Sequence, residues 1–187
     1  MTTLNNKVAA VIGGGTMGTD IAAIFLASGW QVEIVEPTLD RWDWARARIR
    51  SSLQQLRPGF QSENFVLRRE LTQLPWATLG IVVECIFEKI ELKQALFKQM
   101  DDLAPAGLML ASNSSSFPIS EISKGLKTRE RMLGLHFFMP AHLVPAVEVV
   151  RGEATDPQVC ARCSDLMRSL GKVPVNVKKD IPGFLAN

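Results

Sequence analysis

Cysteine is scarce in this chain, which has three cysteines among 187 residues. A sparse and odd number argues against a framework of disulfide bonds and favours a reducing compartment. The N-terminal residues also lack the basic stretch followed by an apolar run that marks a secretory signal. We therefore expect a cytoplasmic protein.

Long apolar runs and a strong charge of one sign are missing as well. No hydrophobic run approaches the roughly 18 residues of a membrane span, so we expect no membrane association. The formal net charge of +2 gives no global field for nucleic acid. Cys160 and Cys163 have the C-x-x-C spacing of metal ligands, but they lie within a helical pattern and have no second pair. We therefore expect no metal site.

Apolar strands alternate with amphipathic helices along the chain. The expected strands are residues 7–12, 31–36, 65–71, 80–87, 108–112, 132–138, 147–152 and 173–177. The expected helices lie between Met17 and Gly29, Leu39 and Leu56, Leu92 and Pro105, and Pro157 and Leu170. This alternation predicts an α/β fold with a doubly wound, mainly parallel sheet and helices on both faces, in one domain over residues 1–187. The final residues 180–187 are typical of the opening of a further helix.

The first strand leads directly into Gly13, Gly15 and Gly18, which have the spacing G-x-G-x-x-G. In a dinucleotide site the first glycine allows a tight turn, the second lets the backbone approach a pyrophosphate, and the third lets helix and strand pack closely. The anion then lies at the N-terminus of the helix that follows, beside Thr16 and Met17.

Glu36 ends the second strand, 21 residues after Gly15. An acidic side chain at this place can accept hydrogen bonds from the adenosine ribose and repels a 2′-phosphate, which favours NAD over NADP. The alternatives are a structural turn in another α/β protein and FAD, and only the motifs further along the chain argue against FAD.

Three downstream stretches carry a family resemblance. They are VVECIFEKIELKQALF at residues 82–97, ASNSSSFPI at residues 111–119 and GLHFFMPAHLVPAVEVVRG at residues 134–152. With VIGGGTMG before them and DIPGFLAN after them, they resemble the 3-hydroxyacyl-CoA dehydrogenase family, over nearly the whole chain. The resemblance implies a Rossmann-type NAD-binding domain. In the family a smaller helical C-terminal domain follows, completes the substrate cleft and usually forms a homodimer, and this sequence resembles only the first part.

The family reaction is hydride transfer between a secondary alcohol carbon and nicotinamide, and it needs a base for the alcohol proton. Histidine suits this role near neutral pH, and His136 matches the family's catalytic position. Glu148 lies 12 residues on. Pro140 and Pro145 favour turns between them, so the chain can reverse and bring Glu148 beside His136 to orient its ring. A structural histidine with a surface glutamate is the alternative, and we interpret His142 as a loop residue.

The resemblance implies further site residues. Ser115 would hydrogen-bond the substrate oxygen, Asn113 would lie near the nicotinamide, and Asn187 would contact the substrate carbonyl. Glu88 and Lys93 match positions near the ribose and nicotinamide. Considered alone, the serines also suit a helix cap or a turn, and Glu88 and Lys93 suit a solvated first helical turn.

Two departures from the family bear on the substrate. Met139 replaces an asparagine of the family block HFFNP, and the segment after the second helix, which in the acyl-CoA enzymes contacts the coenzyme A nucleotide, is short. Residues 41–76 hold seven arginines and three acids. These arginines could bind coenzyme A phosphates or form a solvated basic face.

The segments LVPAVEVV and ECIFEKIELK also resemble a sister branch of the family. That branch oxidises small hydroxy acids, such as gulonate or carnitine, and includes the lambda-crystallins. The leading expectation is an L-3-hydroxyacyl-CoA dehydrogenase. The alternatives are a 3-hydroxy acid dehydrogenase and a non-enzymatic NAD-binding protein, against which the presence of His136, Glu148 and Ser115 argues.

Overall fold

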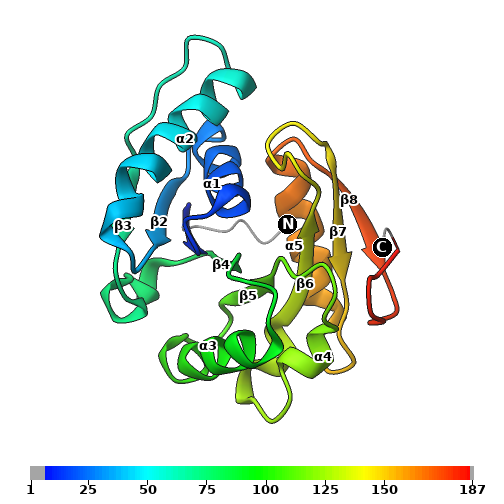
Figure 1. The fold of residues 1–187 in the computed structure, drawn as a ribbon. Helices are drawn as coiled ribbons and strands as arrows, with labels where there is room; N and C mark the ends of the chain where they lie inside the picture. The colour runs from blue at the N-terminus through cyan, green and yellow to red at the C-terminus, as the bar shows by residue number, and fades with distance from the viewer. Residues whose placement is uncertain (1–6, 186–187) are drawn as a thin grey trace.

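An eight-stranded sheet forms the centre of the computed structural model, which describes residues 7–185 (Figure 1). The strands are β1 (Val8–Ile12), β2 (Gln31–Val35), β3 (Phe65–Arg68), β4 (Ile81–Glu84), β5 (Met109–Ser112), β6 (Met132–Phe137), β7 (Ala146–Val150) and β8 (Val173–Val177). Their order in the sheet is β3-β2-β1-β4-β5-β6-β7-β8. Every neighbouring pair is parallel except β6 and β7. The predicted doubly wound, mainly parallel sheet is therefore confirmed, and its order reverses between β1 and β4.

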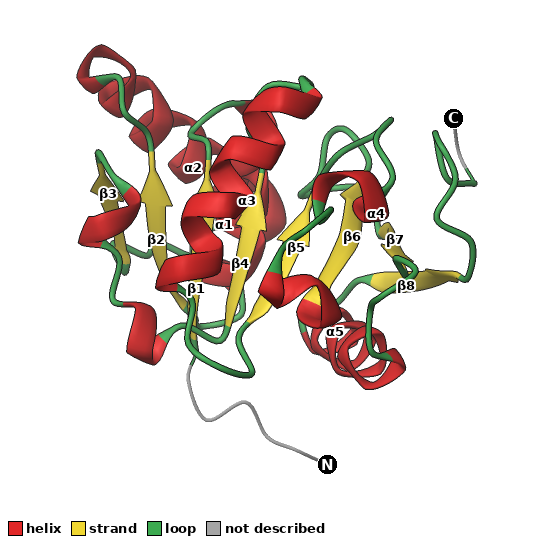
Figure 2. Ribbon diagram, turned by 90° about the horizontal axis from the view of Figure 1, so that it is seen from below, coloured by secondary structure: helices red, strands yellow, loops and turns green. Residues whose placement is uncertain are grey.

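Helices cover both faces of this sheet (Figures 1 and 2). They are α1 (Thr16–Ala27), α2 (Trp42–Leu56), α3 (Ile90–Leu103), α4 (Ile119–Ile122) and α5 (Pro157–Ser169). Residues of α1, α2 and α5 pack on one face, and residues of α3 and α4 pack on the other. Alternate residues of β1 point to the two faces of the sheet. Ala9 and Val11 pack in the hydrophobic cluster on the face of α1, and Ala10 and Ile12 pack in the cluster on the opposite face.

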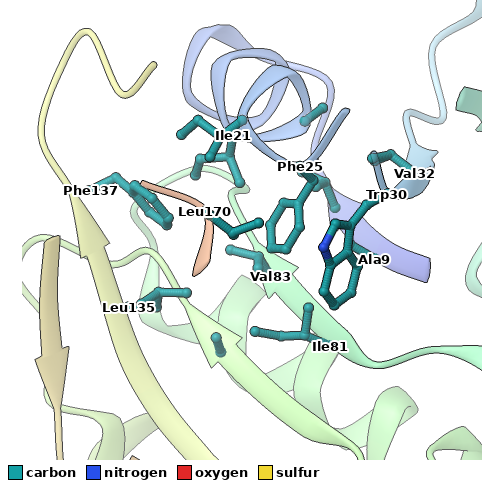
Figure 3. Close-up of a cluster of buried hydrophobic side chains, with 14 of the residues drawn as sticks. Ala9, Ile21, Phe25, Trp30, Val32, Ile81, Val83, Leu135, Phe137 and Leu170 are labelled. Carbon is teal, nitrogen blue, oxygen red and sulfur yellow. The ribbon is translucent and has the colours of Figure 1, made fainter. Parts of the chain in front are cut away.

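The larger cluster lies between α1 and the sheet (Figure 3). Phe25 of α1 packs edge-on against Trp30, with ring centroids 5.2 Å apart. Ile81 and Val83 of β4 are fully buried in the same cluster. Because both faces of the central strands are covered, these strands are almost wholly apolar in sequence rather than alternating.

Some element boundaries differ from the prediction. The strand expected over residues 80–87 ends at Glu84, because the Glu84 carboxylate accepts a hydrogen bond from the Ile86 N–H at 2.7 Å and turns the chain. The helix expected from Leu39 begins at Trp42, after a 3-10 turn over Leu39–Arg41. Residues 182–185 form a turn.

Candidate dinucleotide and catalytic site

The glycine loop (Gly13–Gly18) connects β1 to α1, and two of its glycines are required by the chain itself. Gly13 has φ +109°, and a Cβ there would lie 2.6 Å from the Cys85 carbonyl oxygen. A Cβ at Gly18 would lie 1.9 Å from the Gly13 carbonyl oxygen. The first glycine therefore permits the turn, and the third permits α1 to approach β1 closely.

Gly15, the second glycine of the motif, instead has open space beside it. A Cβ at Gly15 would meet a single atom within 4 Å, a guanidinium nitrogen of Arg41 at 3.9 Å. No side chain caps α1 at this end, where Thr16 is exposed and Met17 half-buried. A helix N-terminus with room beside it suits a pyrophosphate, because the first-turn N–H groups and the helix dipole favour an anion.

Glu36 is buried beside the glycine loop at the end of β2. Its carboxylate accepts hydrogen bonds from the backbone N–H of Gly14 at 3.3 Å and of Thr38 at 3.0 Å. The nearest Arg41 nitrogen lies 4.0 Å away. These contacts place the Glu36 carboxylate next to the loop, where it can accept hydrogen bonds from the ribose hydroxyl groups of a dinucleotide.

His136 and Glu148 face each other across the antiparallel pair β6 and β7. They are direct partners in the strand register, and His136 Nδ1 lies 2.7 Å from Glu148 Oε2. Both residues are at least 96% buried. The structure thus brings together the two residues for which the sequence predicts proximity, because the turn after β6 reverses the chain.

Lys93 lies fully buried between two carboxylates rather than on a solvated helical turn. Its Nζ is 2.7 Å from Glu84 Oε1 and 3.2 Å from Glu88 Oε2. Glu84 also accepts a hydrogen bond from the Ser112 hydroxyl at 2.6 Å. The sequence analysis did not identify Glu84. The signal that could have identified it is an acidic residue at the end of an otherwise apolar strand, nine residues before Lys93.

The Glu88 carboxylate organises the loop that follows β5. Its Oε1 accepts hydrogen bonds from the N–H groups of Ser115 at 3.0 Å and Ser116 at 2.9 Å, and from the Ser114 hydroxyl. Burial acts to raise the pKa of Glu88, but the Ser114 hydrogen bond and the Lys93 charge outweigh it and lower that pKa. Glu88 is therefore held as an anion that fixes the position of Ser115.

Asn113 connects this loop to β6. Its side-chain oxygen accepts a hydrogen bond from the Phe137 N–H at 2.9 Å, one residue beyond His136. Glu88, Asn113, Ser115 and His136 therefore gather at the carboxyl edge of β4, β5 and β6, where open α/β sheets bind their ligands. Asn187 lies outside the described residues.

His142 lies in the turn after β6, as expected for a loop residue, but it is buried. Its Nδ1 is 3.0 Å from Asp20 of α1, and its Nε2 is 3.2 Å from the Gln55 side-chain oxygen. Met139 is 70% exposed in the same turn.

Most of the arginines between residues 41 and 76 are engaged within the chain. Arg48 pairs with Asp20, Arg50 with Glu63 and Arg68 with Glu33, at 2.8–3.1 Å. Arg57 donates to the Ala27 carbonyl oxygen at 2.9 Å. Arg41 and Arg46 lie over the rings of Trp44 and Trp42. Arg48 and Arg68 are therefore held by buried carboxylates, whereas the Arg50–Glu63 pair is exposed.

All three cysteines are free thiols in the structure. Cys160 and Cys163 are free and buried in α5, and burial raises the pKa of both thiols. Over residues 7–185 no group of three or more histidine, cysteine or acidic side chains is placed to hold a metal ion. Within the same range, no helix has the length and apolar character needed to cross a membrane.

The glycine loop at the N-terminus of α1, beside the reversal of strand order, defines a dinucleotide-binding α/β domain. The family model described as "3-hydroxyacyl-CoA dehydrogenase, NAD binding domain" matches residues 8–181. The chain belongs to this family, and its cofactor is NAD.

The sequence similarity to the proteins below extends over almost the whole chain. Mitochondrial hydroxyacyl-coenzyme A dehydrogenase of Homo sapiens is 33% identical over 97% of this chain and 62% of its own length. The 5-formyl-3-hydroxy-2-methylpyridine 4-carboxylate 5-dehydrogenase of Mesorhizobium japonicum is 34% identical over 95% of this chain and 59% of its own. The crystal structure of 3-hydroxybutyryl-CoA dehydrogenase from Escherichia coli has a TM-score of 0.88 and 33% identity, over 97% of this chain and 40% of that one. The chain thus spans less than two thirds of the length of these relatives.

Proposed function

We propose that this chain is the dinucleotide-binding part of an NAD-dependent enzyme that interconverts L-3-hydroxyacyl-CoA and 3-oxoacyl-CoA by hydride transfer. The observation that carries the proposal is the buried His136–Glu148 pair, 2.7 Å apart, at the sheet edge that also holds Asn113 and Ser115. Membership of the family supports the reaction type.

NAD, when bound, supplies the acceptor for the hydride. The glycine loop and the first turn of α1 would hold its pyrophosphate, and Glu36 its adenosine ribose. Glu88, Lys93 and Asn113 would lie near its nicotinamide end, as the resemblance to the family implies.

His136 acts as the acid and base in this proposal. Because Nδ1 is engaged by Glu148, Nε2 takes the proton from the alcohol oxygen during oxidation and returns it during reduction. The Glu148 carboxylate fixes the ring tautomer and stabilises the imidazolium that forms. Ser115, in the loop that Glu88 holds, donates a hydrogen bond to the substrate oxygen.

A 3-hydroxy acid without coenzyme A is the second candidate substrate. The pairing of Arg48 and Arg68 with buried carboxylates favours it, because those two side chains are then not available for coenzyme A phosphates. One relative of comparable identity has a name that specifies a pyridine carboxylate rather than a thioester.

Oxidation of NADH by the full-length protein separates the two substrates. We expect kcat/KM for acetoacetyl-CoA to exceed that for acetoacetate at least about tenfold, because the thioester adds binding energy. The N-acetylcysteamine thioester of acetoacetate, which lacks the nucleotide, is the control that separates the thioester from coenzyme A phosphates. Equal or faster use of acetoacetate would assign the protein to the hydroxy-acid branch.

Glu36 is predicted to set the preference for NADH over NADPH. Glu36→Gln keeps the shape of the side chain but removes the charge that repels a 2′-phosphate, so the ratio of kcat/KM for NADPH to NADH should rise about tenfold. Glu33→Gln is a matched control, because Glu33 is a buried glutamate of β2, three residues before Glu36, and pairs with Arg68. An unchanged ratio in the Glu36 variant would remove Glu36 from this role.

A further inference from the structure

Asp180 connects the C-terminal turn (residues 182–185) to the start of α4. Its Oδ1 accepts a hydrogen bond from the Ile119 N–H at 2.8 Å, and its Oδ2 accepts from the N–H and hydroxyl of Ser120 at 2.7 and 2.5 Å. The Ser120 hydroxyl oxygen in turn accepts from the Glu153 N–H at 3.0 Å. One half-buried carboxylate thus joins segments that are 60 residues apart.

The C-terminal turn reaches the His136–Glu148 pair directly. The Leu185 N–H donates to Glu148 Oε1 at 3.1 Å, while His136 Nδ1 holds the other oxygen, Oε2. Phe184 is buried, and its ring centroid lies 5.7 Å from that of His136. Phe184 also has φ +55°, a conformation that a bulky residue adopts only where its surroundings hold it.

The other end of the connection is the loop that follows β5. Glu88 fixes this loop through the N–H groups of Ser115 and Ser116, and α4 begins three residues after Ser116. Asp180 therefore lies between the serine loop and the turn that contacts the catalytic pair.

We propose that Asp180 is a positioning residue: it holds the C-terminal turn against α4, so that the Leu185 N–H orients Glu148 and, through it, His136. This inference rests on the proposed role of His136 as acid and base. It adds Asp180 to the residues that set the reaction geometry, through its contacts with α4.

The effect expected from losing Asp180 follows from the contacts. The Leu185 N–H and His136 Nδ1 hold the two oxygens of the Glu148 carboxylate. Without the first contact, Glu148 and the ring that it orients can leave the geometry that proton transfer needs. The rate should therefore fall, and its pH dependence should change, while the dinucleotide still binds.

The test compares Asp180→Asn with Asp101→Asn in the full-length protein. Asp101 is a matched control, because its carboxylate also accepts two backbone N–H groups, from Lys127 and Thr128 at 3.2 and 2.7 Å, between α3 and a turn remote from the sheet edge. Rates of 3-hydroxybutyryl-CoA oxidation are measured from pH 5 to 9, with NADH affinity and the midpoint of thermal unfolding.

We expect Asp180→Asn to lower kcat at pH 7 about tenfold, as a small misplacement of reacting groups does. NADH affinity should stay within about twofold of the wild-type value, and the acid limb of the pH–rate profile should change. Ser120→Ala removes one of the three hydrogen bonds and should give a smaller change of the same kind. Asp101→Asn should lower the thermal midpoint and leave kcat and the profile unchanged.

An Asp180→Asn enzyme with lowered thermal stability, unchanged kcat and an unchanged pH profile would overturn the inference. If that variant does not fold, Ser120→Ala decides by the same readouts. The titration of the His136 ring by NMR separates this result from a failure of the proposed function. A wild-type protein without activity on the thioester would refute the function, whereas an unmoved His136 titration in both variants would refute the role of Asp180.

Discussion

Replacing His136 by glutamine is expected to lower kcat about a thousandfold while NADH binds within about twofold of the wild-type affinity. Glutamine fills a similar volume and can still donate to Glu148, but it cannot accept and return the alcohol proton. His136 lies on β6, whereas the glycine loop connects β1 to α1 and Glu36 directly follows β2. The rate should therefore fall without loss of the dinucleotide. Steady-state rates and a fluorescence titration with NADH measure the two quantities.

His142→Gln is the control for this experiment. His142 is the other buried histidine, and it contacts Asp20 and Gln55 rather than a carboxylate of β7. Its replacement should lower the free energy of unfolding and leave kcat largely intact. A collapse of NADH affinity in the His136 variant, or an undiminished kcat, would show that His136 is a structural residue.

The sheet could be predicted from the sequence because its strands are buried on both faces. Strands such as β1 and β4 are then nearly continuous apolar runs, and a glycine follows β1 and precedes β4. The pairing of His136 with Glu148 was also predictable, since two prolines between them favour a reversal of the chain. The assignment of both residues to catalysis stays a prediction.

The buried charges could not be predicted in the same way. A glutamate or lysine at the start of a helix normally lies in solvent, and Lys93 becomes buried only because Glu84 and Glu88 both contact it. The end of β4 depends on the same cluster, because the Glu84 side chain takes the Ile86 N–H. Asp180 contacts α4 across 60 residues, a separation at which periodicity and motif spacing carry no signal.

The glycine loop permits a prediction that separates the requirements of the fold from those of the ligand. Gly18→Ala would place a Cβ 1.9 Å from the Gly13 carbonyl oxygen. This contact is with backbone, so no side-chain rotation relieves it and α1 must move away from β1. We expect a loss of at least about 3 kcal/mol in the free energy of unfolding, with NADH binding lost as well. Urea unfolding and NADH titration measure both effects.

Gly15→Ala should give the opposite pattern. Gly15 has φ −77°, which alanine adopts readily, and its Cβ would meet no atom closer than 3.9 Å. The free energy of unfolding should therefore stay within about 0.5 kcal/mol of wild type. The added methyl group would occupy the space beside the first turn of α1, so NADH affinity should fall at least about tenfold. If Gly15→Ala binds NADH normally, the pyrophosphate does not lie against this glycine. If both variants lose stability equally, the loop conformation rather than the ligand accounts for both glycines.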